Sequence, residues 1–156
     1  MSDNARNING THLEKQVAQL LEKNKINFLA QLTLKPTNHR LDIVVMTSTK
    51  ELYNFSCKTS FRDRIYQCTQ EGADLKQYYQ SSKTIIVTYE NDEVISRVKT
   101  RGKASNAFTN AIDDIIHVNE LEAFLKNNTW IDPVVDSTVF KKLGEKTPKK
   151  STKKKN

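Results

Sequence analysis

Four side chains in the first half of the sequence have the chemistry to bind a metal ion and cleave a phosphodiester bond. Asp42 and Glu71 are carboxylates that flank Lys58 on either side, and Glu14 lies further upstream. Metal-dependent cleavage of a phosphodiester needs hard oxygen ligands, an activated water and positive charge near the developing phosphorane. We expect Asp42, Glu71 and Glu14 to bind the metal, while Lys58 orients the water and offsets the transition-state charge.

The segment after Lys58 carries donors and an acceptor that suit a G·C base pair. Arg62, Asp63 and Arg64 form a triplet that begins four residues after the lysine. Arginine donates a pair of hydrogen bonds to guanine O6 and N7 in the major groove, and a carboxylate accepts one from cytosine N4. We therefore expect the triplet to bind bases of double-stranded DNA. The alternative interpretation is a solvated start of a helix.

A sheet must position these residues. Strands are predicted over residues 27–35, 41–47, 51–58 and 84–89, because these runs are rich in apolar and β-branched side chains. The first three are separated by short turns, which favour antiparallel neighbours. Asp42 and Lys58 would then lie near the open ends of adjacent strands and share one site.

Helices are predicted over residues 11–24, 62–79, 92–100 and 119–127, with a further short strand over 114–118. Residues 11–14 match a capping box, so Glu14 has a second interpretation as the capping partner of Thr11. The inward face of the second helix is predicted to contain Ile65, Cys68, Gly72, Leu75 and Tyr79. The predicted fold is α/β (α+β), with a central mixed sheet of four to five strands flanked by helices in the order α-β-β-β-α-β.

Length and charge indicate one folded domain over residues 11–140, between a flexible N-terminus at 1–10 and a disordered Lys-rich tail at 141–156. The tail holds eight lysines and one glutamate, which accounts for the net charge of +7. The folded body is therefore neutral, and any DNA-binding surface on it must be a local patch. The tail is interpreted as a nonspecific tether to polyanions or as a solubilising segment.

No run of apolar residues is long enough to span a bilayer, and no secretory signal is visible. We expect a soluble, cytoplasmic protein associated with DNA and not with a membrane. Cys57 and Cys68 are expected to be reduced thiols, with Cys57 in the core.

Asp42, the tripeptide Ser56-Cys57-Lys58 and the predicted order of elements resemble the PD-(D/E)XK nuclease superfamily, with leucine in place of its proline and Ser56 in place of its usual acid. The sequence is most similar to the restriction endonucleases of the EcoRII and NgoMIV type, the CCGG family. In these enzymes a glutamate twelve or thirteen residues after the lysine supplies the missing acid, and here twelve residues separate Lys58 from Glu71. Residues 58–64 match that family's pattern of Lys-Thr-x-x-Arg-acid-Arg.

The resemblance implies catalytic roles for Asp42, Lys58 and Glu71 and base recognition by residues 62–64. It implies a magnesium-dependent type II restriction enzyme that cuts a G/C-rich palindrome in double-stranded DNA. A homodimer follows from that task, since two subunits related by the two-fold axis of the site cut both strands. Alternatives are an intron-encoded homing endonuclease or a nicking subunit of the same fold, and a catalytically inactive DNA-binding module.

Overall fold

The computed structural model describes residues 3–61, 64–142 and 144–146. The helices are α1 (Asp3–Lys23), α2 (Arg64–Tyr78), α3 (Asp92–Gly102), α4 (Asn106–Ala111), the 3-10 helix η1 (Val118–Glu120) and α5 (Leu121–Lys126). The strands are β1 (Phe28–Leu34), β2 (His39–Thr47), β3 (Leu52–Cys57), β4 (Ser82–Thr88), β5 (Asp114–His117), β6 (Trp130–Ile131), β7 (Phe140–Lys141) and β8 (Gly144–Lys146).

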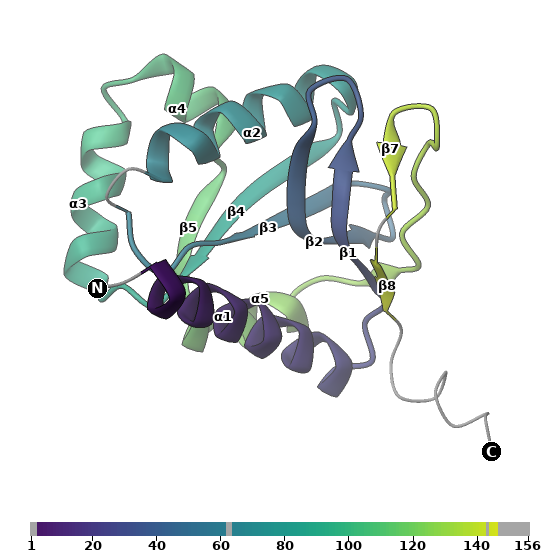
Figure 1. The fold of residues 1–156 in the computed structure, drawn as a ribbon, viewed down its shortest axis with the longest axis horizontal. Helices are drawn as coiled ribbons and strands as arrows, with labels where there is room; N and C mark the ends of the chain where they lie inside the picture. The colour runs from purple at the N-terminus through teal and green to yellow at the C-terminus, as the bar shows by residue number, and fades with distance from the viewer. Residues whose placement is uncertain (1–2, 62–63, 143, 147–156) are drawn as a thin grey trace.

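One mixed sheet runs through the molecule in the order β5-β4-β3-β2-β1-β7 (Figure 1). The hairpins β1–β2 and β2–β3 are antiparallel, as the short turns predict. β4 pairs in parallel with β3, and β5 in parallel with β4. Parallel pairing requires crossover connections, and α2 makes the first of them while α3 and α4 lie in the second.

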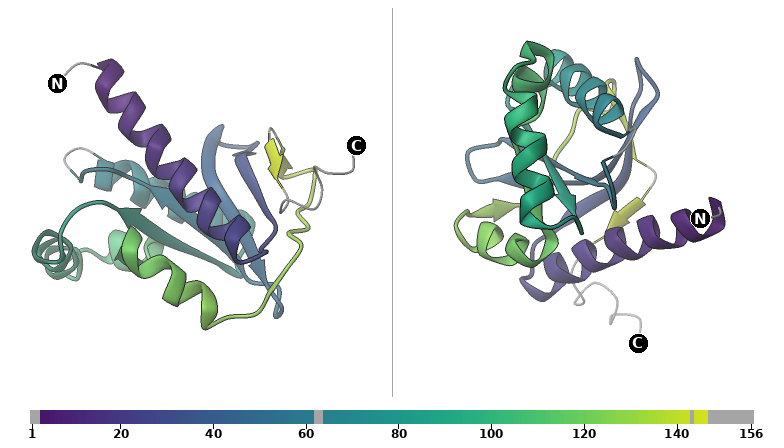
Figure 2. Two further views of the ribbon diagram at one scale, coloured as in Figure 1. Left: turned by 90° about the horizontal axis from the view of Figure 1, so that it is seen from below. Right: turned by 90° about the vertical axis from the view of Figure 1, so that its left-hand side faces the viewer.

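Helices cover both faces of this sheet, as Figure 2 shows. On one face α1 and α5 pack on the strands through a cluster that includes Leu13, Val17, Leu21, Phe55, Val87, Leu121 and Leu125. On the other face α2, α3 and α4 share a cluster that includes Phe61, Cys68, Ile86, Ile95, Ala111 and Ile115. Both faces of β4 are therefore buried, which explains its continuous apolar sequence. The predicted α+β class, with a mixed sheet flanked by helices, is confirmed.

Within the described residues the sheet has eight strands, so the predicted number of four to five was too low. The three additional strands are only two or three residues long: β6 pairs with β2, and β7 and β8 pair with β1. Elements of this length carry no detectable alternation of apolar and polar residues. β7 and β8 supply hydrogen-bond partners to the outer side of β1, and β6 supplies them to the end of β2 that extends beyond its pairing with β1.

Both boundaries of the predicted domain differ in the structure. α1 begins at Asp3, so residues 3–10 are helical rather than a flexible N-terminus. Gly10 costs only about 1 kcal/mol within a helix, which is too little to end it. The predicted disordered tail starts too early, because Lys141 lies in β7 and residues 144–146 form β8. Residues 147–156 of that tail lie outside the described part of the chain.

The inward face of α2 agrees with the prediction. Cys68 and Leu75 are fully buried, and Ile65 and Tyr79 pack against the hydrophobic clusters. A Cβ atom at Gly72 would lie 2.5 Å from the carbonyl oxygen of Ala111, so α4 approaches α2 as closely as only glycine allows. The sequence pattern did not predict α4, whose position holds α2 against the sheet.

Candidate active site

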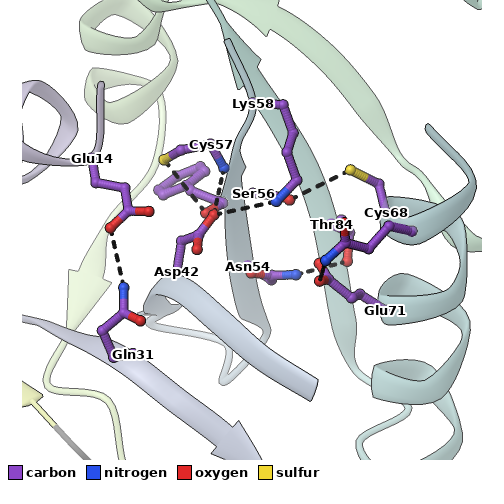
Figure 3. Close-up of polar contacts among 12 residues, drawn as sticks. Glu14, Gln31, Asp42, Asn54, Ser56, Cys57, Lys58, Cys68, Glu71 and Thr84 are labelled. Atoms are coloured by element: carbon purple, nitrogen blue, oxygen red, sulfur yellow. Dashed lines mark hydrogen bonds and ion pairs between the residues drawn. The ribbon is translucent and has the colours of Figure 1, made fainter. Parts of the chain in front are cut away.

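The centre of the site lies where β2 and β3 meet α1 and α2 (Figure 3). Ile43 of β2 pairs with Phe55 of β3, which brings Asp42 beside the residues that end β3. The distance from Lys58 Nζ to Asp42 Oδ2 is 3.7 Å. The same Oδ2 atom accepts a hydrogen bond of 2.8 Å from the backbone N–H of Cys57. The predicted proximity of Asp42 and Lys58 is therefore present, and a backbone donor fixes the carboxylate.

Lys58 is a buried cation, with only 7% of its surface exposed. Burial by itself would lower the pKa of its ammonium group, but the carboxylates of Asp42 and Glu71 raise that pKa above its ordinary value. The net effect keeps Lys58 charged at neutral pH. A charged donor in a site largely closed to water interacts more strongly with a phosphate than an exposed lysine does.

Glu14 reaches the site from α1. Its carboxylate lies beside that of Asp42 (Figure 3), and burial together with the charge of Asp42 raises the pKa of Glu14 to about 7. Its Oε1 atom accepts a hydrogen bond of 3.1 Å from Gln31 Nε2. α1 continues through Thr11, so Thr11 is not the N-cap residue that the capping box requires. The structure thus favours the interpretation of Glu14 as a site residue.

Glu71 approaches the site from the opposite side. Its side chain is 5% exposed, and its Oε2 atom accepts a hydrogen bond of 3.3 Å from Gln67. Burial raises the pKa of Glu71, while the charge of Lys58 acts in the other direction. Figure 3 shows Glu14 and Glu71 on either side of the pair formed by Asp42 and Lys58.

The three predicted metal ligands do not form one cluster. Within the part of the chain that the structure describes, no three His, Cys, Asp or Glu side chains lie close enough to hold a single metal ion. Glu14 and Asp42 nevertheless suit a divalent cation, because two carboxylates in contact need either a shared proton or a positive charge between them. Hard oxygen donors of this kind are the ligands that Mg²⁺ prefers.

The proposed base readers cannot be placed. Arg62 and Asp63 lie outside the described residues, and Arg64 begins α2 with a side chain that is also outside the description. Phe61, which precedes the triplet, is buried, and Ile65, which follows it, packs against the same apolar cluster. Base recognition by the triplet therefore stays a prediction.

Two residues of the site were not predicted. Gln31 binds Glu14, and no pattern distinguishes it from any other polar residue of a strand. Ser56 stands where the resemblance expects an acid, and its hydroxyl lies 3.7 Å from the thiol of Cys68 in a buried contact. Cys57 and Cys68 are both free and buried, as expected. Burial raises the pKa of Cys68 to about 11, which argues against a reactive thiol there.

No protein-family model matches the chain, and neither a curated protein nor a solved structure matches it. Among the described residues, no helix has the length and apolar character needed to cross a membrane.

Proposed function

We propose that this protein is a magnesium-dependent endonuclease that cleaves double-stranded DNA, and specifically a type II restriction enzyme of the PD-(D/E)XK kind. One observation carries the proposal: the buried Lys58 lies 3.7 Å from the partly buried Asp42, with a further carboxylate on each side of the pair. The antiparallel strands β1, β2 and β3, followed by α2 and the parallel strand β4, support the same resemblance.

Each residue would have a distinct task. Asp42 and Glu14 would hold Mg²⁺, which when bound supplies a Lewis acid and lowers the pKa of a coordinated water. The backbone N–H of Cys57 keeps Asp42 in place for this purpose. The Lys58 ammonium would donate to the water or to a phosphate oxygen and stabilise the added negative charge of the phosphorane. Glu71 would help to keep Lys58 charged.

Recognition of DNA would come from residues 62–64, which begin four residues after Lys58 in the chain. An enzyme that reads a G/C-rich palindrome would act as a homodimer, with one triplet on each half-site. Replacing Arg62 or Arg64 would then cost about 1–3 kcal/mol per lost guanine contact and weaken cognate binding more than random binding. Equal losses on cognate and random DNA would indicate contacts to phosphates instead.

A second candidate function is an inactive DNA-binding module. It is favoured by Ser56, because this residue replaces an acid and its hydroxyl contacts Cys68 instead of joining the carboxylates. A homing endonuclease or nicking subunit shares the proposed chemistry and differs only in its target. A map of cleavage sites on random DNA separates these, since short frequent palindromes indicate restriction and one long rare site indicates homing.

Cleavage of duplex DNA by the purified protein tests the proposal. We expect cleavage in Mg²⁺ and none in a chelator, and a loss of about 100- to 1,000-fold in Lys58→Met and Asp42→Asn. Both substitutions nearly preserve side-chain volume, and binding of DNA should survive them.

The chain offers a matched control in Lys76 and Asp113. Lys76 Nζ lies 3.0 Å from Asp113 Oδ2 in an ion pair. The same Oδ2 atom accepts a hydrogen bond from the backbone N–H of Thr84. Lys76→Met should cleave like the wild type. Full activity in Lys58→Met would remove this lysine from the mechanism, and the absence of any metal-dependent cleavage would favour the inactive module.

A further inference from the structure

Gln31 has an unusual backbone conformation for a residue within a strand. Its φ angle is 56°, in the left-handed region that L side chains rarely adopt. The other described non-glycine residues with positive φ are Lys25, Asn38 and Lys50, and none of them lies within a helix or strand. Such a conformation is ordinary in a turn but costs free energy in a strand.

The position of this strain within the sheet is specific. Ala30 pairs with Ile43 and Leu32 with Leu41, so Gln31 lies opposite Asp42. The register is the same on both sides of Gln31, which means that the strand resumes its pairing after the strained residue. The distortion therefore does not shift the strand, and it occurs beside the central carboxylate of the proposed site.

The side chain of Gln31 connects two elements at this point. Its amide nitrogen donates a hydrogen bond of 3.1 Å to Glu14 Oε1, and Glu14 belongs to α1. Glu14 of α1 also lies beside Asp42 of β2 (Figure 3). Gln31 thus restrains the Glu14 carboxylate at the place where α1 meets the sheet.

We propose that Gln31 is a positioning residue that holds the carboxylate of Glu14 beside Asp42, so that the two form a binding site for a divalent cation. This inference rests on the proposed nuclease function and adds a residue that the resemblance does not assign. Strain at a non-glycine residue persists only where surrounding structure or function maintains it. Glycine would adopt the same backbone without strain, but it would lose the donor to Glu14.

Two variants separate the backbone from the side chain. Gln31→Gly relieves the strain and removes the donor, whereas Gln31→Met keeps the strain and the length of the side chain and removes only the donor. Binding of Mn²⁺ to the full chain without DNA is measured by calorimetry, and the melting temperature is measured without metal. We expect both variants to bind Mn²⁺ about 10-fold or more weakly than the wild type. We expect the melting temperature of Gln31→Gly to equal or exceed that of the wild type.

Asn38→Gly is the matched control, because it also replaces an amide side chain at positive φ, in the turn between β1 and β2. Its affinity for Mn²⁺ should not change. Wild-type affinity in both Gln31 variants would overturn the positioning role, and so would a lower melting temperature of Gln31→Gly, which would indicate a structural role. A wild-type protein that neither binds Mn²⁺ nor cuts DNA would instead overturn the proposed function.

Discussion

At the level of single residues, the buried Lys58 lies between the carboxylates of Asp42 and Glu71. Glu14 lies beside Asp42, on the far side from Lys58, and accepts a hydrogen bond from Gln31. The pair of Glu14 and Asp42 therefore carries the electrostatic strain of the site. Burial of Glu14 and the negative charge of Asp42 both favour the protonated form, which is why the pKa of Glu14 is raised.

Replacing Glu14 by glutamine should change how stability depends on pH. The pKa of Glu14 is about 7 in the folded protein and near 4.5 when unperturbed. The folded state therefore binds the proton more tightly, and the free energy of unfolding should fall as pH rises from about 4.5 to about 7. Glu14→Gln removes this fall. Between pH 4.5 and pH 7, the free energy of unfolding of the variant should therefore rise by about 1–2 kcal/mol relative to that of the wild type, a range that allows for partial screening by solvent.

Urea unfolding across this pH range without divalent metal measures the effect. Glu122→Gln is the control, because hydrogen bonds from Asn24 and Lys23 lower the pKa of Glu122 and the substitution should bring no gain at high pH. A constant difference in stability between Glu14→Gln and the wild type at all pH values would contradict the assigned state of Glu14.

At the scale of elements, α2 links the site to the rest of the fold. It carries Glu71 into the site, and Asp74 Oδ2 on the same helix lies 2.8 Å from His39 Nε2 of β2. Its close approach to α4 at Gly72 limits how far the helix can move. The position of Glu71 therefore depends on a helix contact some distance from the chemistry.

Gly72→Ala should destabilise the protein. Alanine has the higher helix propensity by about 1 kcal/mol, but its Cβ would lie 2.5 Å from a backbone oxygen of Ala111 that cannot move cheaply. We expect a net loss of about 1–3 kcal/mol in the free energy of unfolding, measured with urea. Gln77→Ala, at an exposed position of the same helix, should change it by less than about 0.5 kcal/mol. If Gly72→Ala were more stable than the wild type, α4 would have to shift away from the added Cβ atom at little cost in free energy.

At the scale of the whole molecule, positive charge is concentrated near the C-terminus. Residues 147–156 carry five of the seven net positive charges, and residues 1–146 carry a net charge of only +2. Any long-range attraction to DNA would therefore come from the C-terminal segment, and the site itself would supply only local contacts.

Replacing the five lysines within residues 147–156 by glutamine should weaken binding to random duplex DNA. The dependence of log affinity on log salt concentration should become shallower by up to about 4, because fewer counterions are released. Fluorescence anisotropy over a range of salt concentrations measures this slope. Metal-dependent cleavage at low salt should persist, and an unchanged slope would show that the tail does not contact DNA.

Local patterns in the sequence were sufficient to predict the strands and the helix nearest the site. The apolar runs of β1 to β4 and the inward face of α2 can be recognised in the sequence. A strand or helix that buries one or two faces has a pattern of apolar side chains that continues over several residues. The hairpin between β2 and β3 is also local, and it brings Asp42 close to Lys58. Elements of two or three residues, such as β6 and β7, carry no such repeat.

The sequence by itself determined the strand order of the hairpins and the proximity of Asp42 and Lys58, because both depend on contacts between neighbouring segments. Only the tertiary structure decided that Glu14 contacts Asp42, that Gln31 holds Glu14, and that Glu71 stands across Lys58. These contacts join α1 and α2 to the sheet from opposite faces. The crossing of a helix over a sheet is set by packing of the entire core, which no single stretch of residues encodes.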